Sequence, residues 1–457
     1  MGKTGPIVAP RVTLLMALLA ITSWAAAVPA PERARMADEF VDSIGVCVTL
    51  GDTGSPYSNM EKLVQPALKN LGTRHIRDRL SAKPSFIEAH NRLAASGQRL
   101  MLTAIPARFK DMASIVATLK RFNGLEAVEA VPQTDLGFSY KGREFPLSTL
   151  FFFDDLRQAM DSEPTLKGIP LVVGAPEHAA SYDILCGVAK CPLAFVGIGA
   201  LRLFPSGQPP SLGLDEDAAT ARKLSGDRPL FITEAGYHDQ VSYRGEGQPG
   251  IPETVAGRYM SRLWFEAFRA GAARAYAREL LDLRAGTGGP PTAHYGLVKP
   301  DGMIKLSGFA TRNIVALLAD PGPPFNPGVL EYELITRPDA NVKHVLLQKR
   351  DARFYLVVWQ DLPSYDPYRG EVQEHRMSPA MLFLNTPTTY ARFYQPLMSP
   401  NAHRDVHGFH DRIPFNIPDH PMVIEIAPMR PRIGPDGRAF YPPVQRPERP
   451  RKPQTGR

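Results

Sequence analysis

The chain is 457 residues long, enough for one domain of roughly 250 residues and a second, smaller one. Its composition, 44% hydrophobic and 22% charged, is ordinary for a globular protein with a large buried core. A net charge of +7 could suggest a nucleic-acid partner. The distribution of the charge argues against one, because the excess of Lys and Arg is confined to the two ends of the chain. Residues 430–457 carry eight Lys or Arg and two acids, Lys3 and Arg11 lie near the start, and the middle is close to neutral.

The first 27 residues have the three parts of a secretory signal peptide. Lys3 and Arg11 precede the apolar run 12–24, and Ala25, Ala26 and Ala27 supply small residues for cleavage. An uncleaved anchor helix is the alternative, but this run is too short to span a bilayer comfortably. We therefore expect a secreted or periplasmic protein whose mature chain begins near Val28 and has no transmembrane segment.

The three cysteines agree with export. Cys186 and Cys191 lie five residues apart and could pair in an oxidising compartment. Cys47 lies in an apolar strand and is expected to be a buried free thiol. A zinc site would need closer ligand pairs with histidines nearby, so we expect no metal.

From residue 44 onward, β-strand patterns alternate with helical patterns. Five strands are expected at 44–50, 73–78, 99–105, 125–131 and 169–173. A sixth is expected to end at about residue 204, a seventh to carry Glu234, and an eighth to span 273–281. Helices are expected at 59–71, 85–96, 110–123, 150–160, 253–269 and around 312–318. Eight units favour a closed (β/α)8 barrel, assigned to residues 28–320, over an open sheet. No Gly-rich loop follows the first strand, so a dinucleotide cofactor is not expected.

A Pro/Gly-rich hinge at 321–327 ends this alternation. Short strands follow at 342–348, 353–359, 381–384, 390–394 and 422–426, without convincing helices between them. This pattern predicts a C-terminal antiparallel β-sandwich over residues 321–429. The Pro/Arg-rich tail at 430–457 is expected to be disordered. His403, His407 and His410 are assigned to a solvated loop of the sandwich.

The strand that precedes Glu234 ends in a lone carboxylate, and Gly236 follows almost at once. A buried parallel strand ends in this way when it delivers one acid to the rim of a barrel, where barrel enzymes hold their catalytic groups. A buried strand that ends in a capped acid is the plain alternative.

Several fragments resemble the retaining (β/α)8 glycoside hydrolases of clan A. They are Gly45-Val46, Leu71 to Asp78, Ile232 to His238, Glu279 to Asp282 and Tyr295 to Val298. The resemblance implies that Glu234 is the nucleophile and that Arg77 hydrogen-bonds it. It also implies that Arg77, Arg202, Phe204, Tyr237 and Glu279 bind a poly- or oligosaccharide. No cofactor is implied.

The chain departs from the family at the fourth strand, which should end in Asn-Glu, with that Glu as the acid/base. Pro132 and Gln133 stand there instead. Glutamine can hydrogen-bond a glycosidic oxygen but cannot deliver a proton, a loss that costs roughly a hundred- to ten-thousand-fold. Glu129 and Asp135 share strand parity with Gln133. Glu129 is expected too deep in the barrel to reach a sugar, and Asp135 is better explained as a turn residue.

The sixth strand departs too. Arg202 and Phe204 replace the His-x-Tyr of the family, and Thr49 stands where a first-strand histidine often occurs. The guanidinium of Arg202 either pairs with Glu234 or binds an anionic sugar. We predict a preference for uronate-containing or otherwise acidic glycans.

Three functions remain open. The first is a glycan-binding relative of the glycosidases with impaired catalysis. The second is an active glycosidase for substrates with good leaving groups, because plant thioglucosidases of this family carry Gln at the acid/base place. The third is a non-catalytic scaffold of an envelope polysaccharide system.

Overall fold

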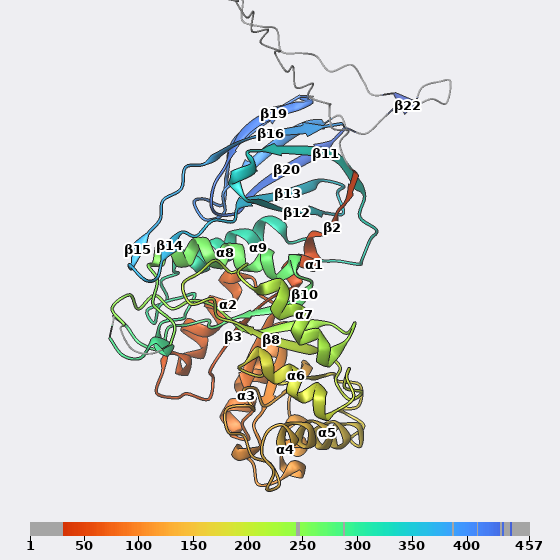
Figure 1. Cartoon of the computed structure of the whole chain (residues 1–457), viewed down its shortest axis with the longest axis vertical. Helices are drawn as coiled ribbons and strands as arrows, with labels where there is room; N and C mark the ends of the chain where they lie inside the picture. Colours follow the sequence, from red (N-terminus) through yellow and green to blue (C-terminus); the bar gives the residue numbers. More distant parts are fainter. Residues whose placement is uncertain are drawn as a thin grey trace, which may run out of the picture.

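A computed structural model describes residues 31–243, 247–286, 288–385, 388–408 and 410–429, together with two short strands at 432–433 and 439–440. A parallel barrel forms the lower part of the molecule and antiparallel sheets form the upper part (Figure 1). The expected signal peptide and most of the basic tail lie outside the described residues.

The barrel consists of eight parallel strands. In chain order they are β3 (Ile44–Cys47), β4 (His75–Arg79), β5 (Arg99–Ala104), β6 (Leu125–Ala130), β7 (Leu171–Val172), β8 (Gly199–Leu203), β9 (Leu230–Ala235) and β10 (Ala272–Ala277). The sheet order is β7-β6-β5-β4-β3-β10-β9-β8, and a parallel bridge between Val172 and Ile198, next to β8, joins its two ends. This confirms the predicted barrel.

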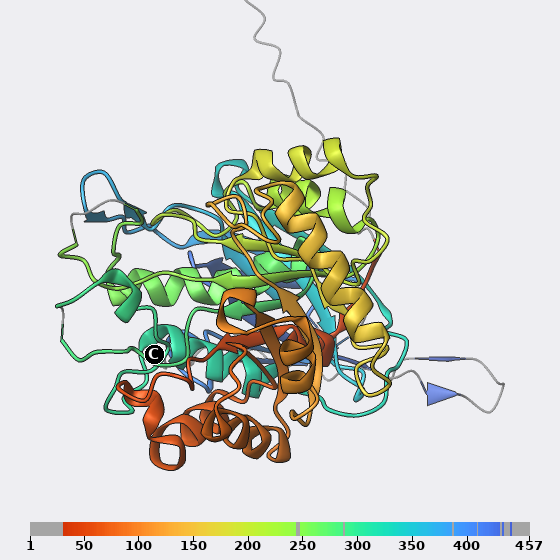
Figure 2. The same cartoon turned by 90° about the horizontal axis from the view of Figure 1, so that it is seen from below.

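Helices follow one another around the strands (Figure 2). They are α2 (Gln65–Leu71), α3 (Pro84–Ala95), α4 (Met112–Leu119), α5 (Leu147–Asp161), α6 (Ala179–Val188), α7 (Leu214–Ser225), α8 (Glu253–Arg269) and α9 (Leu306–Leu318). A short α1 (Ala37–Asp42) precedes the barrel. α2 ends at Gly72, whose φ of 72° lies in the left-handed region that glycine adopts without strain. Of the helices in the described ranges, none is long and apolar enough to cross a membrane.

The second domain is a sandwich of two sheets, antiparallel except for one parallel pair at an edge, and their inner faces share one apolar core. One sheet contains β1 (Pro31–Arg33), β11 (Val329–Thr336), β16 (Ser378–Leu384) and β19 (Arg412–Ile417). The other contains β18 (Ala402–His407), β17 (Thr388–Tyr394), β20 (Met422–Pro428), β13 (Phe354–Gln360), β12 (Val342–Gln348) and β2 (Arg35–Met36). Two hairpins add β14 (Tyr365–Asp366) with β15 (Glu371–Val372), and β21 (Arg432–Ile433) with β22 (Ala439–Phe440).

The sandwich differs from the expectation at several strands, among them β11 and β19, which the sequence did not indicate. Its outer strands β1 and β2 come from the N-terminal end of the described chain, ahead of the barrel, and pair with β11 and β12. His403 and His407 lie on the strand β18, where a loop was expected. That strand was missed because most of its side chains are exposed and it lacks an apolar alternation.

The two domains meet along α8, whose side chains are almost all buried. Arg262, fully buried, forms an ion pair with Asp361 and donates to the Leu362 carbonyl at 2.7 Å. Glu266, also buried, accepts a hydrogen bond from the indole of Trp359 at 3.1 Å. Charged groups therefore join barrel and sandwich in a largely dry interface.

Candidate active site

Glu234 lies near the C-terminal end of β9 and is 6% exposed. Arg77 Nη1 donates to its Oε1 at 2.7 Å, the contact that the resemblance implied, and Arg278 Nη1 lies 3.4 Å from the same oxygen. Arg202 donates to the other oxygen, Oε2, from Nε at 3.2 Å and Nη2 at 3.0 Å. Burial alone would raise the pKa of Glu234, but the three guanidinium groups outweigh it and hold this pKa well below its usual range.

Arg77 is buried between two carboxylates. Its Nε donates to Glu129 Oε2 at 2.7 Å, and Thr103 donates to the same oxygen at 2.5 Å. Glu129 is fully buried. It is therefore the core acid that the sequence predicted, and it fixes the guanidinium that contacts Glu234.

A second carboxylate at the rim, Glu177, was missed by the sequence analysis. It forms an ion pair with Arg202 Nη1 and accepts a hydrogen bond from Gln133 Nε2 at 3.0 Å. Arg202 bonds both Glu177 and Glu234, so one guanidinium bridges these two carboxylates. Glu177 follows the two-residue strand β7 and belongs to no motif, so only its position in space identifies it.

The loop that carries Glu177 is held in place by Asp135. This carboxylate accepts the backbone N–H groups of Glu177 at 2.8 Å and His178 at 3.0 Å, and the Ser181 hydroxyl at 2.7 Å. Burial raises the pKa of Asp135, but these donors lower it more, so the net shift is downward. Asp135 thus positions the start of α6, as a turn residue would.

The parity expected along 129–135 does not extend past the strand. β6 ends at Ala130, and Gln133 has a φ of 57°, so the backbone has already turned. Gln133 and Asp135 therefore do not point as continuations of the strand from Glu129. Because the backbone turns after β6, the amide of Gln133 reaches Glu177 in the neighbouring loop.

Glu279 follows β10 and is buried beside the Arg278 that contacts Glu234. Thr49 and Tyr57 donate to its Oε2 at 3.2 and 3.3 Å, whereas the buried Oε1 has no hydrogen-bond partner among the described residues. Burial raises the pKa of Glu279 to about 7, against the opposing effect of Arg278. This acid is therefore divided between its neutral and charged forms near neutral pH.

Two predicted aromatic residues take different places. The ring of Phe204 lies 5.0 Å from the Arg202 guanidinium carbon and 5.8 Å from the ring of Tyr295, so it borders the Glu234 cluster. Tyr237 is buried, donates to the Gln208 carbonyl at 2.8 Å and packs against Tyr259. Among the described residues, Tyr237 forms no hydrogen bond to the cluster around Glu234, and its contacts are those of a core residue.

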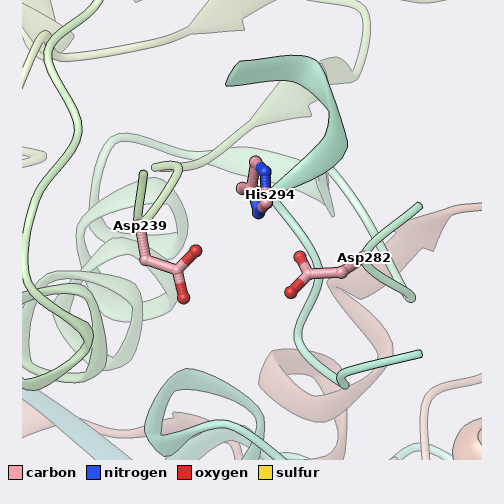
Figure 3. Close-up of side chains that lie close together, drawn as sticks. All are labelled: Asp239, Asp282 and His294. Carbon is pink, nitrogen blue, oxygen red and sulfur yellow. The ribbon is translucent and has the colours of Figure 1, made fainter. Parts of the chain in front are cut away.

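Asp239, Asp282 and His294 come together beside the barrel mouth and could hold a metal ion by composition (Figure 3). The ammonium of Lys305, however, lies 2.8 Å from Asp239 Oδ2 and 2.6 Å from Asp282 Oδ2. The Lys305 ammonium thus already pairs with both carboxylates, and a metal ion would have to displace it. The three residues come from two separate loops, which is why the sequence did not indicate the cluster.

Two cavities open at this end of the barrel. A small one of about 220 Å³ is lined by Thr49, Asp78 and Arg79, at the ends of β3 and β4. A larger one of about 940 Å³ lies between the loops after β9 and β10 and the β14–β15 hairpin. Glu234, Arg202 and Gln133 do not line the larger cavity, so it is separate from the cluster around Glu234.

Comparison with known proteins supports the architecture. No protein-family model and no curated protein matches the chain. Among solved structures, the chain is similar to a family 39 glycoside hydrolase from Bacteroides cellulosilyticus WH2, with a TM-score of 0.57, 13% identity and coverage of 86% of this chain and 82% of that one. It is also similar to a family 39 enzyme from Xanthomonas axonopodis pv. citri (0.56, 14%, 87% and 96%). A family 30 endoxylanase from Clostridium papyrosolvens C71 follows (0.52, 9%, 88% and 98%). At these identities the likeness concerns the fold.

Proposed function

We propose that the barrel mouth binds a poly- or oligosaccharide and that hydrolysis of glycosidic bonds is impaired. One observation carries this proposal: both oxygens of Glu234 accept bonds from guanidinium groups, including two bonds from Arg202 to Oε2. The fold, which the chain shares with glycoside hydrolases, supports a carbohydrate ligand.

The chemistry of a retaining glycosidase explains the impairment. One carboxylate must attack the anomeric carbon while a second group protonates the leaving oxygen. Three guanidinium groups stabilise Glu234 as an anion before reaction, and this stabilisation is partly lost as its charge disappears into a covalent bond. Gln133, at the expected position of the acid, has no proton to give.

The balance of charges favours a neutral sugar. Arg77, Arg202 and Arg278 face the carboxylates of Glu129, Glu177 and Glu234, so each cation has a matching anion. Of the two roles foreseen for Arg202, pairing with Glu234 is the observed one. We therefore do not retain a preference for acidic glycans.

A second candidate function, turnover of substrates with good leaving groups, is favoured by Glu177. Its carboxylate contacts the amide of Gln133, close to where the family places its acid/base. After an activated leaving group departs without a proton, Glu177 would be placed to activate the water that releases the sugar.

The proposed location is outside the cytoplasm. Cys186 and Cys191 form a disulfide, a bond that persists in oxidising compartments, and Cys47 is a buried free thiol. N-terminal sequencing of exported protein should begin near Val28, and an intact Met1 on cytoplasmic protein would contradict the signal peptide.

Binding and turnover measured on the same protein test the function. A glycan array should show binding of neutral poly- or oligosaccharides, and 2,4-dinitrophenyl glycosides should be turned over slowly or not at all. Brisk, Glu234-dependent turnover of natural glycosides would overturn the impairment. Absence of any glycan binding together with absence of turnover would instead favour the scaffold function.

A further inference from the structure

The 940 Å³ cavity is built from both domains. Its barrel walls are the loops that follow β9 and β10, so it opens at the same end of the barrel as Glu234. The third wall is the β14–β15 hairpin, for which the chain leaves the sandwich between β13 and β16 (Figure 1). Its volume lies in the range typical of ligand pockets.

The hairpin is anchored on the barrel loops. Tyr365 donates to the Gly250 carbonyl at 3.4 Å. Pro367 packs closely against Gly207, because a Cβ atom added to Gly207 would lie 3.2 Å from the Cβ of Pro367. At the tip, Asp366 Oδ1 accepts the backbone N–H groups of Tyr368 at 2.9 Å and Arg369 at 3.1 Å. The backbone that carries Tyr368 is therefore an ordered turn, and the side chain of Tyr368, 94% exposed, lines the cavity.

Another part of the lining is polar and buried. Asp282, His294 and Lys305 are each at most 4% exposed. Asp239 lies close to Asp282 and His294 (Figure 3). Carboxylates that already bond the Lys305 ammonium keep further lone pairs that can accept hydroxyl groups. The described lining carries four acidic and four basic side chains, which favours a neutral ligand rich in hydroxyl groups.

Tyr295 links this cavity to the mouth of the barrel. Its ring lies 5.8 Å from the ring of Phe204 and 5.8 Å from the guanidinium carbon of Arg278, both of which border Glu234. On the other side it lies 5.2 Å from the ring of His238, and the adjacent His294 lines the cavity. Contacts through Tyr295 and its chain neighbour His294 thus connect the residues around Glu234 with the lining of the cavity.

From this geometry we infer that the cavity is a second sugar site, which takes further residues of a neutral oligosaccharide between the Asp239–Asp282–Lys305 cluster and the ring of Tyr368. Its link to the mouth rests on the proposed function. The aromatic ring offers an apolar face for a sugar ring, and the ionic cluster offers acceptors and a donor for sugar hydroxyl groups.

Calorimetric titration of the mature full-length protein tests this site. The probes are the hexaoses and bioses of β-1,4-glucan, β-1,4-xylan and β-1,4-mannan. A hexaose that binds the wild type should bind Tyr368→Ala roughly five- to tenfold more weakly, Tyr368→Trp should retain affinity, and the biose should respond less. Phe151→Ala is the matched control, because it removes another exposed aromatic ring, on α5, that does not line the cavity.

A mouth variant, Phe204→Ala, distinguishes this inference from the proposed function. Loss of hexaose affinity in Phe204→Ala with unchanged affinity in Tyr368→Ala would overturn the second site and leave the mouth intact. The reverse pattern would support the cavity and contradict sugar binding at the mouth. A wild-type protein that binds none of the six sugars would contradict both.

Discussion

Arg202 and Glu234 are register partners on the neighbouring parallel strands β8 and β9, and the guanidinium bonds one carboxylate oxygen through both Nε and Nη2. That oxygen would have to be free for attack on a sugar. Because Arg202 also pairs with Glu177, a single side chain holds both rim carboxylates.

Replacing Arg202 should therefore release the nucleophile. We expect Arg202→His, the family's residue type at this position, to speed covalent labelling of Glu234 by 2,4-dinitrophenyl 2-deoxy-2-fluoro glycosides about tenfold, which corresponds to about 1.4 kcal/mol. Intact-protein mass spectrometry with a panel of β-gluco, β-xylo and β-galacto reagents measures the rate. Arg202→Lys, which keeps the charge, should gain less. Labelling no faster than in the wild type would show that Arg202 does not restrain Glu234.

Gln133→Glu should restore proton delivery. The new carboxyl would lie beside Glu177, and two adjacent carboxylates raise the pKa of the pair, which favours a protonated acid. Turnover of aryl glycosides should rise tenfold or more, with the gain largest for poor leaving groups. Glu234→Ala should abolish both background and gain. If the variant stays inert while glycan binding persists, the protein is a binder on a glycosidase fold.

Glu279 should make stability depend on pH. Burial raises its pKa from 4.5 to about 7 in the folded protein, so the folded state holds this proton more tightly than the unfolded chain. Its contribution is therefore fully present below about pH 4.5 and is lost as pH rises through 7, by roughly 3 kcal/mol at most. Urea denaturation between pH 5 and 8 should show a weaker fall for Glu279→Gln, whereas Glu61→Gln, at an exposed position, should keep the wild-type slope. An equal fall in Glu279→Gln would refute the assignment.

The domain interface should depend on Arg262. Arg262→Ala would remove one of the two cations that pair with Asp361, whose side chain is 8% exposed. Because Lys343 remains 2.8 Å from Asp361, the loss should stay below the about 3–5 kcal/mol of a fully unpaired buried charge. The midpoint of chemical denaturation should fall accordingly, while Arg337→Ala, which breaks an exposed pair with Asp339, should leave it unchanged. A shift no larger than that of Arg337→Ala would contradict the role of Arg262.

Local patterns predicted the elements that are amphipathic or bounded by caps. The helix α8 was expected at its observed bounds, and the sandwich strands β12, β13, β16, β17 and β20 were expected near theirs. β11, β18 and β19 were missed, and of these β18 is mostly exposed whereas β19 alternates regularly between buried and exposed residues. Glu234 was predicted because it stands near the end of a recognisable buried strand, and Arg77 because its fragment resembles the glycoside hydrolases. Their contact at 2.7 Å depends on the closed order of the sheet, to which the repeated strand–helix pattern pointed.

The missed residues depend on relations that local patterns do not contain. Glu177 reaches the site because Asp135, 42 residues earlier, holds the backbone of its loop. The Lys305 ammonium pairs with Asp239, which belongs to a different loop. The positive φ of Gln133 turns its side chain away from the direction that strand alternation predicts. Each is a matter of tertiary placement, which neither periodicity nor residue spacing encodes.

The outermost strands β1 and β2 place the beginning of the described chain on the free edges of both sandwich sheets, and Arg33 bonds the Pro327 carbonyl 294 residues later. During synthesis the partners of β1 and β2 are made only after the whole barrel, so residues 31–36 stay unpaired until then. Until then, or if residues 31–36 are trimmed away, β11 and β12 are unprotected edges that another polypeptide can extend by strand addition. We therefore expect residues 31–36 to protect the C-terminal sandwich from aggregation by covering the edges of β11 and β12.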